Sequence, residues 1–551
     1  MRSIIQSTML MSFCCHSIPA LAQQNRNPFE SVDNRGEWVA GDAGTRGQME
    51  QVVAPTVAEN SLHPTPPGSS SITIGAISVT TAPEIPSQIL VTSYEKFIGQ
   101  EASQENLSAL ASAISTAARE RGYIFASAQI PRQSVAIGVV SVQLDPGAID
   151  EVRILGAQNK RLQKILNKLH CNAAHSDMIE RQLLLAGDLP GISLENTSYQ
   201  RENGKGVLIV TVREDKAKGY AALDNYGPKT LGPFRARLDL DIAGLLMDGD
   251  VLTTNVISSV QQPRELTYIN ARYAMTLGDG GTVIGFSGAG GRTSSGSYLR
   301  SFDFTGRNRY ASVFASHAVL RSNDFNLWIN AELAYLNVEQ SQNGQLFQDD
   351  RIATAALNFS GNYNLGIGRI YGGIGVTQGL GILGASEVGD LLNSRRDGSG
   401  EFTKANFWIN SILDVGGGFG MRLAGNAQIA SRPLLSPNEI AIGGPYFGKG
   451  YDFSERFGDE GVLGLAELRK EFKNANSWLD WFQLYGFVDG GYVSNIGTGY
   501  GDGSLASAGG GVRAQIGKFD LGVEAAAPVS DDRFESGDRS PKMNVQVGLR
   551  F

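Results

Sequence analysis

Two kinds of apolar periodicity divide the chain. Between about residues 71 and 215, short alternating runs are mixed with runs whose apolar residues recur every three or four positions, which predicts both strands and amphipathic helices. From about residue 216 onward the helical period disappears and only the alternation of apolar and polar residues remains. The pattern therefore predicts an α+β region followed by a long region of β-strands.

The α+β region contains the same unit twice, over residues 71–146 and 147–215. Each copy is predicted to run strand, helix, helix, strand, strand. The predicted elements are a strand at 72–81, helices at 88–99 and 104–121 and strands at 123–130 and 135–144, then a strand at 151–155, helices at 160–169 and 177–186 and strands at 193–200 and 206–214. Two tandem β-α-α-β-β domains are expected.

Residues 216–551 are expected to form a transmembrane barrel. Segments such as 234–242, 327–335 and 542–551 place apolar residues on one face of a strand and polar residues on the other. Glycine, at 68 of 551 residues, is concentrated in this region. In lipid such a sheet must close to satisfy its edges, and at about 10 residues per strand the region permits roughly sixteen antiparallel strands. The predicted fold class is mostly β, with two α+β domains before the barrel.

The N-terminus has the features of an export signal. Residues 1–22 combine a basic residue, an apolar stretch and an A-x-A site, which is typical of a secretory signal peptide. Its removal would leave Cys171 as the only cysteine and hence no internal disulfide. Residues 23–70 are polar and rich in Gly and Pro, which indicates a periplasmic linker.

Composition and charge exclude other classes. The formal net charge of -8 argues against nucleic acid as a partner. Beyond the signal, no window approaches the 18 or more apolar residues that a membrane helix requires. A soluble β-sandwich would also show alternating strands, but the signal peptide, the lack of disulfides and the final aromatic residue, Phe551, favour the barrel.

Tandem β-α-α-β-β units before a barrel resemble POTRA domains and the Omp85 superfamily. Three motifs more specifically resemble the two-partner secretion transporters, which export haemolysins and haemagglutinins. The first motif looks like the first hairpin of the family's barrel and comprises residues 219–227, 231–235 and 245–250. The second, residues 443–451, resembles the family's V-R-G-Y/F loop motif. The third, residues 487–491, resembles its F-x-D-x-G strand motif.

The resemblance implies a contact inside the barrel. It places a loop tip in the lumen beside a motif on a neighbouring strand, and Lys449 stands where the family has arginine. The implied contact is a Lys449–Asp489 ion pair, of looser geometry than an arginine would give because an ammonium is a point charge. The implied residues are Gly448, Lys449, Gly450 and Tyr451 on the loop, Phe487, Asp489 and Gly491 on the strand, and Phe551 as a C-terminal assembly signal.

The resemblance also implies a function. It is that of an outer-membrane translocation pore of a Gram-negative bacterium, which exports one large partner exoprotein recognised by POTRA domains in the periplasm. Outer-membrane lipid and the barrel assembly machinery are the other implied partners. Alternatives are an insertase of the same superfamily, which typically has more POTRA units, and a passive porin, which would not need residues 71–215. Residues 23–50 contain no convincing amphipathic helix to serve as the family's plug.

No cofactor, metal or catalytic activity is expected. The spacing of Gly443, Gly448 and Lys449 nearly matches a phosphate-binding loop, but the next residue, Gly450, has no hydroxyl for Mg²⁺. His170, Cys171 and His175 would lack a fourth metal ligand. The chain has no G-x-S-x-G motif, so it is predicted not to be an enzyme.

Overall fold

The computed structural model describes residues 72–81, 83–133, 138–476 and 479–551. The predicted signal peptide and linker lie outside these residues. The chain divides into two compact units: the described residues up to Asp215 belong to the N-terminal unit, and the C-terminal unit comprises Lys216–Leu277 and Gly281–Phe551.

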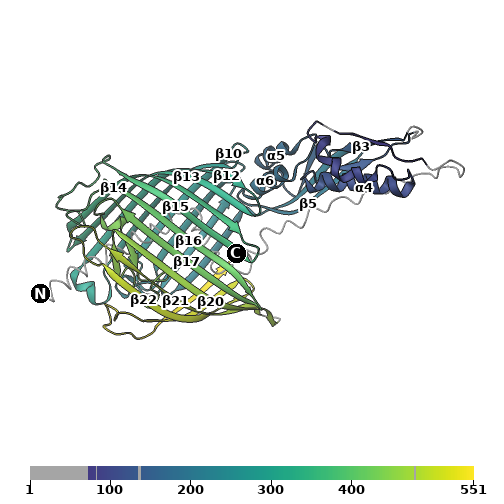
Figure 1. Cartoon of the computed structure of the whole chain (residues 1–551). Helices are drawn as coiled ribbons and strands as arrows, with labels where there is room; N and C mark the ends of the chain where they lie inside the picture. The colour runs from purple at the N-terminus through teal and green to yellow at the C-terminus, as the bar shows by residue number, and fades with distance from the viewer. Residues whose placement is uncertain (1–71, 82, 134–137, 477–478) are drawn as a thin grey trace. The chain divides into compact units, whose positions relative to one another are not determined.

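The first half of the N-terminal unit is a three-stranded sheet covered by helices (Figure 1). Its strand order is β1-β3-β2, with β1 parallel to β3. The elements are β1 (Ala76–Thr80), η1 (Ser87–Leu90), α3 (Val91–Tyr94), η2 (Glu95–Phe97), α4 (Gln104–Glu120), β2 (Ser127–Gln129) and β3 (Val139–Asp145). Leu110 and Ile114 of α4 pack on Val140 and Val142 of β3 to form the core. The helix predicted at 88–99 is three short turns, and within it the Ser93 hydroxyl donates to the Leu90 carbonyl, which competes with regular helical hydrogen bonding.

The second half repeats this arrangement. Its sheet has the order β4-β6-β5, again with a parallel pair, β4 and β6, and an antiparallel one. The elements are β4 (Glu151–Leu155), α5 (Lys160–Leu166), η3 (Asn167–Leu169), α6 (Ser176–Gly187), β5 (Ile192–Glu202) and β6 (Lys205–Glu214). Leu162, Ile165, Leu183, Leu208 and Val210 are fully or almost fully buried. The β-α-α-β-β order is present in both halves.

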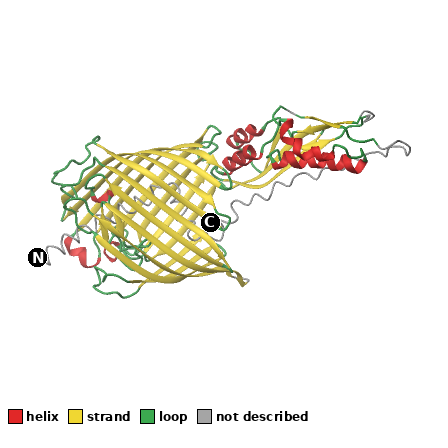
Figure 2. Cartoon of the chain, in the orientation of Figure 1, coloured by secondary structure: helices red, strands yellow, loops and turns green. Residues whose placement is uncertain are grey.

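The C-terminal unit is a closed antiparallel barrel, with sixteen wall strands among the described residues (Figure 2). The strands that form its wall are β7 (Ala217–Asp224), β8 (Arg235–Ala243), β9 (Asp250–Ser259), β10 (Leu266–Leu277), β11 (Thr282–Ser294), β12 (Phe304–Arg321), β13 (Phe325–Gln342), β14 (Gln345–Asn364), β15 (Gly368–Leu380), β16 (Thr403–Gly416), β17 (Phe419–Ala430), β20 (Glu460–Asn476), β21 (Leu479–Ser494), β22 (Gly503–Ile516), β23 (Phe519–Pro528) and β24 (Lys542–Arg550). Short 3-10 turns lie between them: η4 (Lys229–Leu231), η5 (Ser297–Phe302) and η6 (Ser436–Asn438). The prediction of a mostly β chain with about sixteen antiparallel strands is confirmed.

Burial distinguishes the two faces of the barrel wall. Along β21, Gln483, Tyr485 and Asp489 are buried, whereas the alternate residues Leu484 and Val488 are exposed. Apolar residues therefore point outward and polar ones into the lumen, as a barrel in lipid requires. Among the helices of the described residues, none combines the length and apolar character needed to cross a bilayer.

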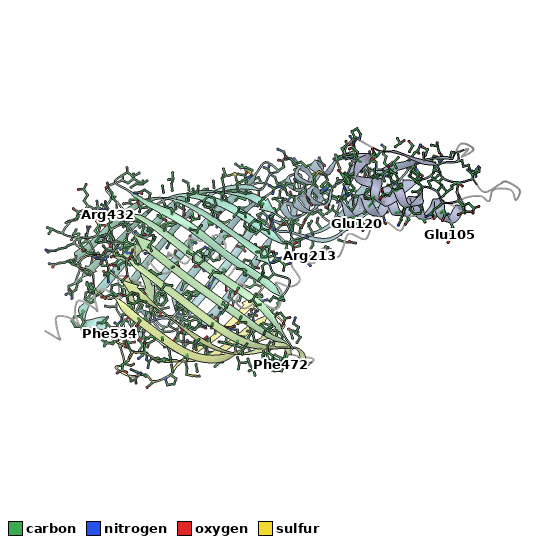
Figure 3. The ribbon with its side chains drawn as sticks, in the orientation of Figure 1. Glu105, Glu120, Arg213, Arg432, Phe472 and Phe534 are labelled. Carbon is green, nitrogen blue, oxygen red and sulfur yellow. The ribbon has the colours of Figure 1, made fainter. Side chains whose placement is uncertain are left out.

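The two ends of the barrel differ in the length of their connections. One end carries the long connections 225–234, 295–303, 381–402, 431–459, 495–502 and 529–541 together with the shorter 260–265 and 343–344. At the other end the turns 278–281, 322–324, 365–367, 417–418 and 517–518 are all short. In Figure 3, Arg432 and Phe534 lie at the end with the long connections and Phe472 lies at the opposite end.

Candidate functional site: a segment folded into the barrel lumen

Residues 431–459, here called the inward segment, join β17 to β20 without forming part of the wall. Within the segment, β18 (Ile440–Ile442) pairs with β19 (Arg456–Gly458), and this small hairpin contacts β20, β21 and β22. Its apolar side packs on inward-facing Leu463, Val493 and Leu505. The inward segment therefore occupies the lumen beside these strands.

The tip of the inward segment binds the wall through its backbone. The Asp489 carboxylate on β21 accepts hydrogen bonds from the backbone N–H groups of Gly448 (2.8 Å) and Lys449 (3.0 Å). The Ser507 hydroxyl on β22 donates to the same carboxylate and accepts from the Gly450 N–H at 3.1 Å. Three consecutive N–H groups are thus satisfied by two wall side chains, and Gly448 supplies the turn with a φ of +78°.

The Lys449 side chain binds a different wall carboxylate from its backbone. Its ammonium lies 2.8 Å from Glu524 on β23 and 4.3 Å from the centre of the Phe487 ring, and the Tyr485 hydroxyl donates to the same Glu524 oxygen at 3.0 Å. The prediction of a Lys449–Asp489 ion pair is therefore wrong, because the ammonium pairs with Glu524 instead. Asp489 is already bonded to the tip backbone and to Ser507, and the lysine side chain reaches the Glu524 carboxylate, whose oxygen it shares with the Tyr485 hydroxyl.

Gly450 and Tyr451 bring the tip close to the wall. A Cβ at Gly450 would lie 2.6 Å from the Ala527 carbonyl carbon, so only glycine fits without moving the backbone. Tyr451 is fully buried, and its hydroxyl contacts the Ala506 carbonyl at 3.1 Å and the Ser530 hydroxyl at 3.0 Å. The tip is anchored to both β22 and the β23–β24 connection.

The predicted strand motif faces this tip. Phe487 and Asp489 are both buried on the inward face of β21. Gly491, in the same phase, leaves no room for a side chain, because a Cβ there would lie 2.4 Å from the Val462 carbonyl oxygen. The structure thus brings the loop motif and the strand motif together, with Asp489 bonded to the tip backbone and the Lys449 ammonium paired with Glu524.

A second anchor, which the sequence patterns did not predict, lies at the base of the inward segment, where it joins β20. Asp459, which is fully buried, accepts hydrogen bonds from the N–H groups of Leu434 (2.6 Å) and Ile496 (2.8 Å) and from the Arg395 guanidinium (2.8 Å). Arg395 comes from the β15–β16 connection and also pairs with Glu439 at 3.3 Å. Glu439 and Asp459 are 44 and 64 residues from Arg395, so no local pattern marks them.

Asp397 extends this anchor to the β21–β22 connection. Its carboxylate pairs with Arg395 at 2.7 Å and accepts from the Thr498 N–H at 3.0 Å. Burial alone would raise the pKa of Asp397, but the Thr498 and Arg395 contacts outweigh burial and lower it. These contacts join three of the long connections, 381–402, 431–459 and 495–502, at the base of the inward segment.

Phe551 lies at the seam that closes the barrel. β24 pairs with β7, and beyond the last paired residues the Phe551 N–H and carbonyl exchange hydrogen bonds with Gly219 at 3.0 and 2.8 Å. Its ring covers Gly219 and is exposed. Its role as an assembly signal stays a prediction.

The fold and the lumen segment define the class: a transporter of the Omp85 superfamily with a POTRA-type N-terminal unit. The family model of the haemolysin secretion/activation protein ShlB/FhaC/HecB matches residues 204–514, more than half of the chain, and the model of the ShlB-type POTRA domain matches residues 72–147. The chain belongs to this family and is a two-partner secretion transporter of the outer membrane.

Individual proteins and solved structures are similar to this chain. The heme/hemopexin transporter protein HuxB of Haemophilus influenzae is 24% identical over 392 residues, which cover 69% of this chain and 68% of HuxB. CdiB from Escherichia coli has a similar structure, with a TM-score of 0.73 and 17% identity over 95% of this chain and 98% of CdiB. BamA from Haemophilus ducreyi lacking POTRA domains 1–3 reaches a TM-score of 0.50 with 14% identity, covering 87% of this chain and 100% of that one.

Proposed function

We propose that this transporter carries one large, unfolded partner exoprotein from the periplasm through the barrel to the cell surface. The observation that carries the proposal is the inward segment, which fills part of the lumen and is held only by hydrogen bonds, ion pairs and packing. Such contacts are strong enough together to hold a segment and weak enough singly to be exchanged for contacts with a passing chain. Because the periplasm offers no ATP, folding of the exoprotein outside the cell would drive the transfer.

The exported protein can be identified by removing the transporter. The culture medium and the outer membrane of the parent strain are compared with those of a strain that lacks this chain. Loss of one large protein from the medium, with the other outer-membrane barrels unchanged, is the expected result. General loss of other barrels would instead identify this protein as an insertase. If neither fraction changed, the remaining assignment would be a passive porin.

We further propose that the N-terminal unit recognises the exoprotein by strand addition. In both of its sheets the described strands leave open edges, on β1 and β2 in the first and on β4 and β5 in the second. An extended polypeptide can pair with such an edge through its main chain. The eleven-residue β5, paired only with β6 among the described strands, offers the longest edge.

Site-specific photo-crosslinking tests this recognition. A photoreactive residue is placed at exposed Ser78 on β1 or exposed Ser198 on β5, and, as a control, at exposed Glu105 on helix α4, which Figure 3 labels. The protein that disappears from the medium of the deletion strain should be captured at an edge strand and not at Glu105. Capture at Glu105 alone would contradict strand addition.

A further inference from the structure

Three arginines form a patch on the outer face of β11 and β12. Outward-facing Phe286 and Val313 are opposite each other on these strands and are 58% and 56% exposed. Six residues further along each strand, on the same face, Arg292 lies opposite Arg307, and both are exposed. Exposed Arg309 follows on the same face of β12, opposite Gly290.

This patch begins where the apolar outer face ends. On the neighbouring strand β13 the outward-facing residues change from Leu333 and Tyr335 to Asn337 and Glu339. Asn337 lies opposite Arg309, and Glu339 lies opposite Arg307. An aromatic residue followed by polar ones marks the boundary between the hydrocarbon core and the head groups. The arginines therefore lie at the level of the lipid head groups.

The patch belongs to the end of the barrel with the long connections. Arg292 and Arg307 flank the connection 295–303, and the short turn 278–281 lies at the other end of β11. In outer-membrane barrels the longer loops are extracellular. The relevant head groups are therefore those of the outer leaflet, a step that rests on the outer-membrane placement of the proposed function.

The charges of the patch are not balanced within the protein. Arg309 pairs with Glu339 at 2.9 Å, so that carboxylate is already engaged. Among the described residues, neither Arg292 nor Arg307 has an ion-pair or hydrogen-bonding partner for its side chain. Like charges directly opposite each other on neighbouring strands repel, and an anion between them would remove the repulsion.

We propose that Arg292 and Arg307, flanked by Arg309, bind the phosphate groups of a phosphorylated lipid in the outer leaflet. The planar guanidinium matches the oxygens of a phosphate in a two-pronged hydrogen bond. Gly290, on the same outward face, has open space where a side chain would stand, since the nearest atom to a Cβ there is a backbone oxygen at 3.8 Å. The acyl chains of the lipid then continue along Phe286 and Val313.

Lipid retention by the purified full-length barrel tests this site. The lipopolysaccharide that copurifies is quantified for the wild type, for Arg292→Gln/Arg307→Gln and for a control, Arg396→Gln/Lys518→Gln, which removes two charges from other exposed positions. The first double variant should retain at least about fivefold less lipopolysaccharide, while the control retains the wild-type amount. The slower migration of boiled samples in gel electrophoresis verifies that each barrel is folded.

Rebinding of lipid to the delipidated protein tests whether the phosphate groups are what the arginines recognise. Phosphorylated lipopolysaccharide should bind, and the same lipid after enzymatic dephosphorylation should bind at least about fivefold more weakly. Equal retention by the Arg292→Gln/Arg307→Gln variant, equal binding of dephosphorylated lipid, or equally tight binding of inorganic phosphate alone would overturn the proposal. None of these readouts measures export, so a failure of the proposed function would show separately, as unchanged culture medium in the deletion strain.

Discussion

Lys449 is held at two places by two different carboxylates: its backbone N–H by Asp489 at 3.0 Å and its ammonium by Glu524 at 2.8 Å. The two carboxylates lie on different strands, β21 and β23. The tip of the inward segment is thus anchored by its backbone independently of its side chain, and the two anchors can be separated by substitution.

The backbone anchor should dominate the local stability of the tip. Asp489→Ala removes the acceptor of two backbone N–H groups, which should cost about 2 kcal/mol at about 1 kcal/mol per bond, or roughly a 30-fold increase in opening. Amide hydrogen exchange of a peptide covering 444–451 measures this opening. Asp480→Ala is the control, because Asp480 also accepts a backbone N–H, that of Gly517, at the far end of the same strand. Equal exchange in both variants would contradict the assignment.

A methyl group at Gly450 should displace the tip. Gly450→Ala forces the new Cβ against the Ala527 and Pro528 backbone, which cannot yield without distorting β23. We expect an assembled barrel with reduced export and with a tip that proteases cleave. Gly464→Ala in β20 is the matched control, because the nearest atom to its Cβ would be 4.0 Å away. Wild-type export by Gly450→Ala would show that close approach of the tip is not required.

The base anchor should limit leakage through the pore. Arg395→Gln leaves the buried Asp459 carboxylate without its cation, and breaking such a buried pair costs about 3–5 kcal/mol. We expect a higher and more variable single-channel conductance in planar bilayers and greater sensitivity of cells to large antibiotics. Arg396→Gln removes the same charge from the neighbouring exposed residue and should behave as the wild type. Identical conductance of the two variants would exclude this role.

Acid should loosen the same region through Asp397. Because its pKa is lowered in the folded state, its stabilising contribution is complete above the ordinary aspartate pKa of about 3.9 and is lost as the pH falls through the folded value. Conductance should therefore rise at the acidic end of a pH 7 to 3 titration. Burial raises the pKa of Asp459, an opposite shift, so Asp397→Asn is the variant that isolates the effect. Its conductance should be raised already at pH 7 and should change less with acid; an unaltered profile would contradict the assignment.

The general fold could be predicted because its signals are local. Alternation of apolar and polar residues along single strands, as in 234–242, determines which face meets lipid, and the same alternation along β21 places Asp489 inward. Strand ends were less predictable: Tyr123–Ile130 contains only the short strand Ser127–Gln129, because the first residues form a turn in which the Ala126 N–H donates to the Tyr123 carbonyl at 2.9 Å.

The partners of the site residues could not be predicted to the same extent. The motif positions correctly indicated which segments meet, but not which carboxylate receives the Lys449 ammonium, because Glu524 lies 75 residues away with no motif of its own. Arg395 was missed for the same reason. Contacts of this kind depend on the strand order and register of the closed barrel, which no local pattern records.

The most direct test of the account is the amount of exoprotein in the medium of the deletion strain after complementation. The wild-type chain and Lys449→Arg, which can pair with Glu524 through a guanidinium, should restore secretion, whereas Lys449→Ala should restore much less despite a normally assembled barrel. Full secretion with Lys449→Ala would contradict the claim that the anchored inward segment is required for export.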